Sequence, residues 1–198
     1  MMKKTLLAAA ALCALTSGAA MAQNYPQDGK WMVRARAVHL DSANKDSTPL
    51  DLSVNNKMIP ELDISYFFTP NFAAELILTY PQKHDVRAGG AEIGSLKHLP
   101  PTLLAQYHFT NLGAFKPYVG AGINYTRFSS VDILGGALNV KKNSFGPALQ
   151  VGFDYALDKN WSINVDVKKV YIDTNVSGGI GKFKVDPVLV GVGLGYRF

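Results

Sequence analysis

Large apolar residues recur at every second position in several stretches of this chain, most clearly in the last one. A period of two predicts a β-strand with one apolar and one polar face. A soluble sheet buries such an apolar face in a core, whereas a transmembrane barrel turns it towards lipid, with aromatic residues at the interface. A strand that ends at the C-terminal residue favours the barrel, because the last strand of a barrel pairs with the first. The alternating apolar positions of this strand are Val188, Val190, Val192, Leu194, Tyr196 and Phe198.

The same alternation predicts eight strands, joined by connections that alternate between long and short. Outer-membrane barrels have this asymmetry, with long extracellular loops and short periplasmic turns. The sequence therefore predicts an all-β fold, an eight-stranded antiparallel transmembrane β-barrel of the outer-membrane type. The expected strands span residues 31–39, 61–68, 72–80, 102–109, 117–128, 145–155, 161–168 and 188–198, and the expected long loops span 41–57, 81–100, 129–143 and 173–184.

The N-terminus has the pattern of a secretory signal peptide. Lys3 and Lys4 precede an apolar run from Leu6 to Leu15, which is too short to span a bilayer as a helix. The small residues that follow predict cleavage between Ala22 and Gln23. Residues 1–22 are therefore expected to be removed during export, and residues 23–198 to form a single barrel domain in the outer membrane of a Gram-negative cell.

The amino-acid composition further narrows the class of protein and its expected partners. The chain is 47% hydrophobic, but no stretch after residue 22 has the length of apolar sequence that a transmembrane helix needs. Its formal net charge of +5 falls by two when Lys3 and Lys4 are removed, so we expect no nucleic-acid partner. The expected partners are outer-membrane lipid and lipopolysaccharide, whose phosphates the basic residues could contact. The single cysteine, Cys13, lies in the signal, so the mature protein has no disulfide and no thiol catalysis.

Charged residues occupy the face of the strands that is predicted to point inward. Charges buried in so narrow a space must pair. Arg34 and Arg197 lie on the first and last strands, which become neighbours when the barrel closes. We interpret the inward charges as a polar plug that supports the barrel, with an ion pathway as the alternative. The plug comprises Arg34, Arg36, Glu61, Asp63, Glu75, Asp154, Asp166, Lys168 and Arg197.

A few large apolar residues share the inward face, where the barrel rule expects polar ones. An apolar lining suits a small hydrophobic solute, whereas a small barrel also needs side chains simply to fill it. Both interpretations remain open at this point. The residues are Val38, Phe67, Ile77 and Leu104.

The spacing of histidine, serine and acidic residues in the sequence gives little support for a catalytic or metal site. No carboxylate, histidine and serine are spaced to share one strand face, and a triad is defined by geometry. His84 and His98 fall within the expected loop 81–100, where we expect solvated side chains rather than metal ligands. We therefore predict no enzymatic activity, no metal and no cofactor. The remaining histidines are His39 and His108.

Several segments together resemble the outer membrane protein W (OmpW) family. The matching segments, in order, are 62–76 (LDISYFFTPNFAAEL), 98–107 (HLPPTLLAQY), 116–126 (KPYVGAGINYT), 171–174 (YIDT), 186–187 (DP) and 195–198 (GYRF). The resemblance implies an eight-stranded barrel with a narrow, largely apolar lumen. It also implies passage of small hydrophobic molecules, with an exit sideways into the membrane.

Two functional hypotheses follow for this chain. The first is an outer-membrane channel for small hydrophobic solutes. The alternative is a structural or receptor barrel whose extracellular loops bind host, phage or toxin and whose lumen is only a plug. In both, Tyr196 and Phe198 are expected to form the C-terminal signal for the barrel-assembly machinery.

Overall fold

The computed structural model describes residues 29–46, 50–137, 140–176 and 181–198. The predicted signal peptide and its cleavage site between Ala22 and Gln23 lie outside these residues. The described residues contain no helix that is long and apolar enough to cross a membrane. They form the strands β1 (Trp31–Asp41), β2 (Lys45–Asp46), β3 (Leu52–Val54), β4 (Lys57–Phe67), β5 (Phe72–Leu78), β6 (Gln82–Ala88), β7 (Ala91–Leu99), β8 (Thr102–His108), β9 (Phe115–Ile133), β10 (Asn143–Ala156), β11 (Trp161–Val170), β12 (Asp173–Val176), β13 (Gly181–Lys184) and β14 (Val188–Arg197).

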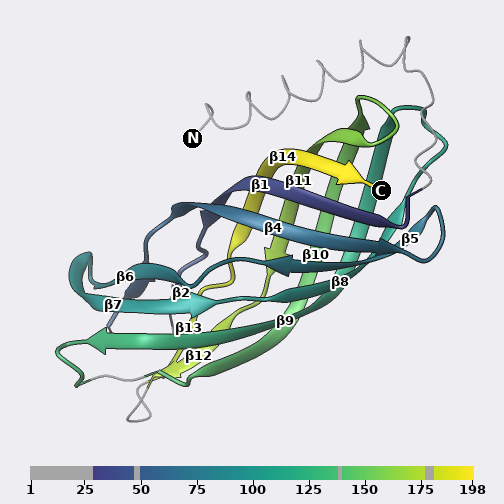
Figure 1. The fold of residues 1–198 in the computed structure, drawn as a ribbon. Coiled ribbons are helices and arrows are strands. Elements are labelled where there is room, and N and C mark those ends of the chain that lie inside the picture. Colours follow the sequence, from purple (N-terminus) through teal and green to yellow (C-terminus); the bar gives the residue numbers. More distant parts are fainter. Residues whose placement is uncertain (1–28, 47–49, 138–139, 177–180) are drawn as a thin grey trace.

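Eight of these strands close into an antiparallel barrel (Figure 1). The order around the wall is β1, β4, β5, β8, β9, β10, β11 and β14, and β14 pairs with β1 to complete the ring. Arg34 and Arg197 therefore lie on adjacent strands, as the sequence predicts. Each of the eight predicted strands overlaps one of these barrel strands, so the predicted fold is confirmed.

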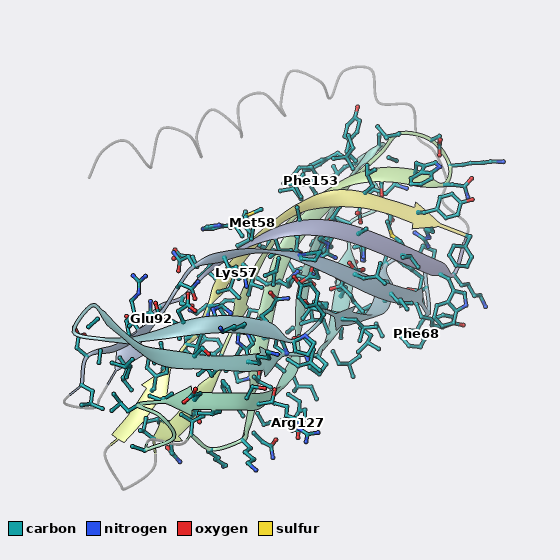
Figure 2. All side chains as sticks on the ribbon, turned by 60° about the vertical axis from the view of Figure 1, so that its left-hand side comes forward. Lys57, Met58, Phe68, Glu92, Arg127 and Phe153 are labelled. Atoms are coloured by element: carbon teal, nitrogen blue, oxygen red, sulfur yellow. The ribbon has the colours of Figure 1, made fainter. Side chains whose placement is uncertain are left out.

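The two ends of the barrel differ. At one end, here named the turn end, short connections join β4 to β5, β8 to β9 and β10 to β11. At the other, named the hairpin end, extra strands extend beyond the ring (Figure 1). Phe68 at the turn end and Glu92 in the β6–β7 hairpin lie at opposite ends of the molecule (Figure 2).

The long connections contain more ordered structure than the sequence predicts. Most of residues 81–100, expected to be a loop, form the antiparallel strands β6 and β7. β7 also pairs with the outer half of β9. β3 adds to the edge of β6, and β2, β12 and β13 form a separate small sheet. The prediction that residues 41–57, 81–100 and 173–184 are loops without strands was therefore wrong. The predicted end of the fifth strand at residue 128 was also wrong, because β9 extends to Ile133.

The barrel wall alternates between exposed and buried side chains, apart from irregular stretches such as Ser129 and Ser130 on β9, which are both exposed. Along β14 the large apolar residues are exposed, whereas Leu189 and Arg197 between them are buried. The exposed apolar side chains form a band around the barrel, edged at the turn end by aromatic rings that contact one another, such as Trp31 with Tyr66 and Trp161 with Tyr196. Tyr196 and Phe198 belong to this edge. Such a band with aromatic rims is the outward face of a transmembrane barrel.

Candidate functional site

The barrel interior is divided into three layers along its axis. The strand β5 shows the order, because its inward side chains are Ala73, Glu75 and Ile77 from the turn end to the hairpin end. Ala73 packs with Met32 and Phe67 in a small apolar cluster. Glu75 belongs to a charged layer, and Ile77 belongs to the large apolar cluster above it. The layers do not follow the strand pairing residue by residue, because Asp63 is paired with Ile77 and Glu75 with Leu104. The strands of a barrel are tilted, so paired inward residues lie at different heights along the axis.

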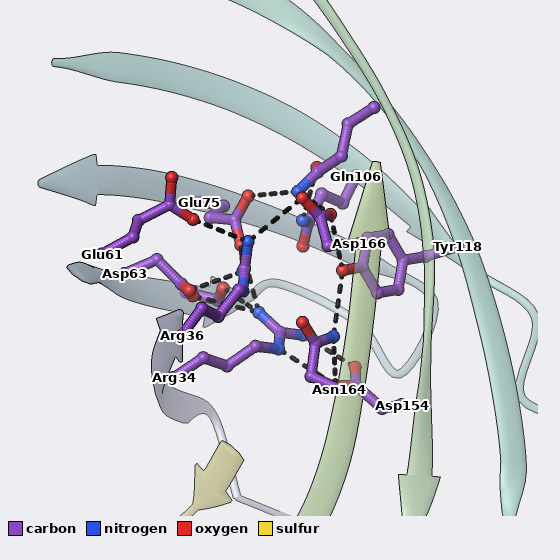
Figure 3. Close-up of polar contacts among 12 residues, drawn as sticks. Arg34, Arg36, Glu61, Asp63, Glu75, Gln106, Tyr118, Asp154, Asn164 and Asp166 are labelled. Atoms are coloured by element: carbon purple, nitrogen blue, oxygen red, sulfur yellow. Dashed lines mark hydrogen bonds and ion pairs between the residues drawn. The ribbon is translucent and has the colours of Figure 1, made fainter. Parts of the chain in front are cut away.

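Arg34 is the centre of the lower half of the charged layer (Figure 3). Its guanidinium makes a two-point contact with Asp154, with Nε–Oδ1 and Nη2–Oδ2 distances of 3.0 and 2.8 Å. The remaining nitrogen, Nη1, donates to Ser65 at 2.9 Å and lies 3.2 Å from both Asp63 and Glu75. All these side chains are buried, so the fork geometry of arginine satisfies several carboxylates at once.

Arg36 and Lys168 hold the upper half of the layer. Arg36 contacts Asp63, Glu61 at 3.0 Å, Glu75 at 2.7 Å and Asp166 at 3.3 Å. Lys168 Nζ lies 2.6 Å from Glu61 and 2.7 Å from Asp166. Lys168 is thus held among carboxylates and does not reach the barrel mouth, although its long stem would permit it.

Uncharged polar side chains complete the layer. The Tyr118 hydroxyl donates to Asp166 at 2.9 Å, and Gln150 Nε2 donates to Glu75 at 2.8 Å and to Asp166 at 2.7 Å. Asn164 Nδ2 donates to Asp154 at 2.9 Å. These partners were not predicted from the sequence, although the alternation along their strands indicates that Tyr118, Gln150 and Asn164 point inward. Together with the ion pairs they link inward side chains of β1, β4, β5, β9, β10 and β11 across the lumen.

Arg197 lies nearer the turn end than this network. Its guanidinium lies 3.7 Å from the centre of the Phe67 ring, and its Nε donates to the carbonyl of Gly29 at 2.6 Å. This places it below the charged layer, at the turn end. Phe67 is likewise separated from the other predicted apolar lining residues, because Val38, Ile77 and Leu104 belong to the apolar cluster above the layer.

A small cavity lies directly above the charged layer. Its volume is about 20 Å³, which holds roughly one water molecule. Glu61 and Lys168 border it on the charged side, and most of the surface is apolar. The lining residues are Leu40, Ile59, Glu61, Ile77, Thr79, His98, Pro100, Thr102, Lys168, Val170, Ile172, Pro187 and Leu189.

The barrel wall beside this cavity is interrupted. The ladder between β5 and β8 ends at the pair Ile77–Thr102, and the next residues back along the chain, Pro101 and Pro100, have no N–H to donate. On the outer side of the same wall a shallow apolar groove is lined by Leu76, Pro101, Thr102, Leu103, Ile123, Tyr125 and Phe145. Thr102 therefore lines both the inner cavity and the outer groove.

The histidines correct an expectation of the sequence analysis. His84 and His98 are not solvated loop residues, because β6 and β7 turn them inward, where both are buried. Their rings stack with centroids 4.6 Å apart and planes 19° apart, and His84 Nδ1 lies 3.1 Å from the carbonyl of Asn55. Burial is the largest cause that lowers the pKa of both residues, to about 3 for His98. Within the described part of the chain, no three His, Cys, Asp or Glu side chains are grouped to hold a metal ion.

The sequence is similar to those of known outer-membrane proteins. Residues 27–198 match the OmpW family. The chain belongs to the OmpW family. Aligned over its whole length, it is 34% identical to outer membrane protein W of Vibrio cholerae, of which it also covers 100%. It is therefore an outer-membrane protein, and its hairpin end is the extracellular end, as in other barrels of this type.

Two further relatives and one solved structure extend the comparison. The chain is 48% identical to the Uncharacterized outer-membrane protein y4mB of Sinorhizobium fredii, over 85% of this chain and 80% of that protein. It is 28% identical to the Dibenzothiophene metabolism operon protein PahQ of Pseudomonas aeruginosa, over 81% of this chain and 80% of the relative. The crystal structure of OprG from Pseudomonas aeruginosa superposes with a TM-score of 0.74 at 28% identity, covering 89% of this chain and 98% of OprG.

Proposed function

We propose that this barrel is a transport protein rather than an enzyme, and that it takes up small hydrophobic molecules from the extracellular side. The observation that carries the proposal is the mainly apolar cavity that lies above the charged layer. Leu40, Ile59 and Ile77 give the cavity an apolar surface, which favours a nonpolar solute over a polar one. The relative PahQ is named for a dibenzothiophene metabolism operon, and dibenzothiophene is a molecule of this chemical class.

The charged layer argues against passage straight through the barrel. Moving a nonpolar solute past Arg34, Arg36 and their carboxylates would break several buried ion pairs at once, at about 3–5 kcal/mol for each partner that is lost. We therefore propose that the solute leaves sideways into the membrane, between the ends of β5 and β8.

The wall at Pro100, Pro101 and Thr102 supports this exit. The two prolines have no N–H that could bridge to β5, and Thr102 lines both the inner cavity and the apolar groove on the lipid side. The cavity holds roughly one water molecule in this structure, so passage requires this segment to move.

Uptake in cells tests the proposal. Cells lacking the protein, re-expressing it, or expressing the Ile77→Arg variant are given labelled dibenzothiophene and a labelled monosaccharide. We expect the protein to speed uptake of dibenzothiophene alone, and Ile77→Arg to abolish that increase while Ile77→Leu retains it. Equal uptake of each tracer with and without the protein would refute the transport function.

The alternative is a structural or receptor barrel that transports nothing. The specific observation in its favour is the same charged layer, which fills the lumen with paired side chains. The extended β6–β7 hairpin would then supply the binding surface. This alternative predicts no change in uptake for either tracer, so the same experiment separates the two functions.

A further inference from the structure

Three cationic side chains lie on the outer surface of three neighbouring strands at the extracellular end, with Arg127 one step nearer the lipid band than Lys83 and Lys97. Lys83 on β6 is directly opposite Lys97 on β7, and Lys97 is opposite Ser129 on β9. Arg127 points to the same face two residues before Ser129, so the three cations occupy three consecutive strands. All three are exposed, and Arg127 projects away from the ribbon (Figure 2).

This arrangement is unfavourable without an anion. Like charges directly opposite each other in an antiparallel pair are destabilising, and such side chains are about 5 Å apart. Among the described residues, no carboxylate forms an ion pair with Lys83, Lys97 or Arg127. The nearest acidic residues are Asp85 on β6 and Asp132 on β9, which flank Ser95 of β7 one outward step further from the lipid band, and neither forms an ion pair with the three cations.

An apolar surface begins immediately below the three cations. Tyr125 and Ile123 precede Arg127 on the outward face of β9, at about 7 Å for each step of two residues. They line the shallow groove with Leu76, Leu103 and Phe145, and Phe145 is 68% exposed. A cationic cluster above an apolar groove matches a molecule with an anionic head and an acyl chain.

We propose that Lys83, Lys97 and Arg127 bind the phosphate groups of a phosphorylated glycolipid of the outer leaflet, with one acyl chain in the groove. The ligand is a lipid rather than free phosphate because the groove and the cations are continuous. It is a glycolipid of the lipopolysaccharide type because the cluster lies at the extracellular end, where this is the phosphate-rich lipid of a Gram-negative outer membrane. The groove is also the lipid-side mouth of the proposed exit, but lipid binding there does not require that the barrel transports solutes.

The test uses the full mature protein, purified in an uncharged detergent, and lipid A carrying both phosphates as the probe. Titration with a fluorescent lipid A measures the dissociation constant for the wild type and for the Lys97→Gln/Arg127→Gln variant. The matched control is Lys30→Gln/Lys159→Gln, which removes two exposed cations at the turn end. Folding of each variant is checked by its heat-dependent migration on a gel.

We expect the Lys97→Gln/Arg127→Gln variant to bind lipid A about 30-fold more weakly and the control variant to bind it like the wild type. Dephosphorylated lipid A should bind all variants equally weakly. Equal affinity of the wild type and the Lys97→Gln/Arg127→Gln variant would overturn the proposal. Inorganic phosphate binding as tightly as lipid A would overturn the assignment to a lipid.

Discussion

Arg34 on β1 and Asp154 on β10 face each other across the barrel interior, with Nε–Oδ1 and Nη2–Oδ2 distances of 3.0 and 2.8 Å. Their strands are not neighbours, because β14 and β11 lie between them in the wall. The pair therefore ties opposite parts of the cylinder together, and its carboxylate and guanidinium are both removed from water. The contact therefore joins two strands that no strand ladder connects directly.

Loss of Arg34 should be strongly destabilising. Arg34→Met leaves the buried carboxylates of Asp154, Asp63 and Glu75 without their shared cation, and we expect it to lower the free energy of unfolding by about 3–5 kcal/mol. Urea unfolding in lipid vesicles, followed by tryptophan fluorescence, measures this loss. Lys159→Met is the control, because this exposed turn residue should change stability by less than about 0.5 kcal/mol.

The pairing itself is tested by a double-mutant cycle. Asp154→Leu combined with Arg34→Met should be less destabilising than the sum of the two single variants, because the double variant leaves fewer buried charges unpaired. Strict additivity would show that the two side chains do not act as a pair.

Gly122 should not tolerate a side chain. A Cβ built on Gly122 would lie 1.9 Å from the carbonyl oxygen of Leu103 on the neighbouring strand β8, so the strands would have to separate. We expect Gly122→Ala to lower the free energy of unfolding by at least about 2 kcal/mol. Ala121→Val, which adds bulk on the lipid side of the same strand, should leave the free energy of unfolding nearly unchanged. Equal stability of Gly122→Ala and wild type in urea unfolding would contradict this close approach.

The buried histidine pair should make the β6–β7 hairpin sensitive to acid. Burial lowers the pKa of His84 and His98, so the unfolded hairpin binds protons more readily than the folded one. Its stability should therefore fall as the pH drops from about 6.5, by up to about 1.4 kcal/mol per pH unit for each histidine, and the contribution of His98 should level off near its folded pKa of about 3.

Hydrogen exchange of the hairpin amides, corrected for the intrinsic effect of pH, measures this opening, with β11 as the reference segment. His98→Phe keeps an aromatic ring in the stack but cannot be protonated, so its exchange should depend less on pH. An identical pH dependence in wild type and His98→Phe would rule out the histidine pair as the cause.

The barrel and its two faces could be predicted from the sequence because lipid and lumen impose a strict period of two. Residues such as Leu194 and Arg197 differ so clearly in polarity that their opposite orientations follow from position alone. The charged inward residues could be identified in the same way. Their partners could not, because contacts such as Arg34–Asp154 depend on side chains that meet across the lumen from strands far apart in sequence.

The hairpin β6–β7 could not be predicted for a different reason. Gln82, Lys83, His84 and Asp85 are polar on both faces of the strand, so the alternation that marks the other strands is missing. Backbone pairing with β7 holds the strand in place, and its inward side is closed by the stacked rings of His84 and His98. The histidines were consequently mistaken for solvated loop residues.

The central claim is that hydrophobic solutes enter the cavity above the charged layer and leave without crossing it. Uptake of dibenzothiophene by Ile77→Phe and Ala73→Leu tests it most directly. Both substitutions add the same number of carbon atoms to the inward face of β5, one on each side of Glu75. We expect Ile77→Phe to slow uptake to the level of cells without the protein, and Ala73→Leu to leave it unchanged. Equal slowing by both variants would mean that the solute crosses the charged layer, and would contradict the account.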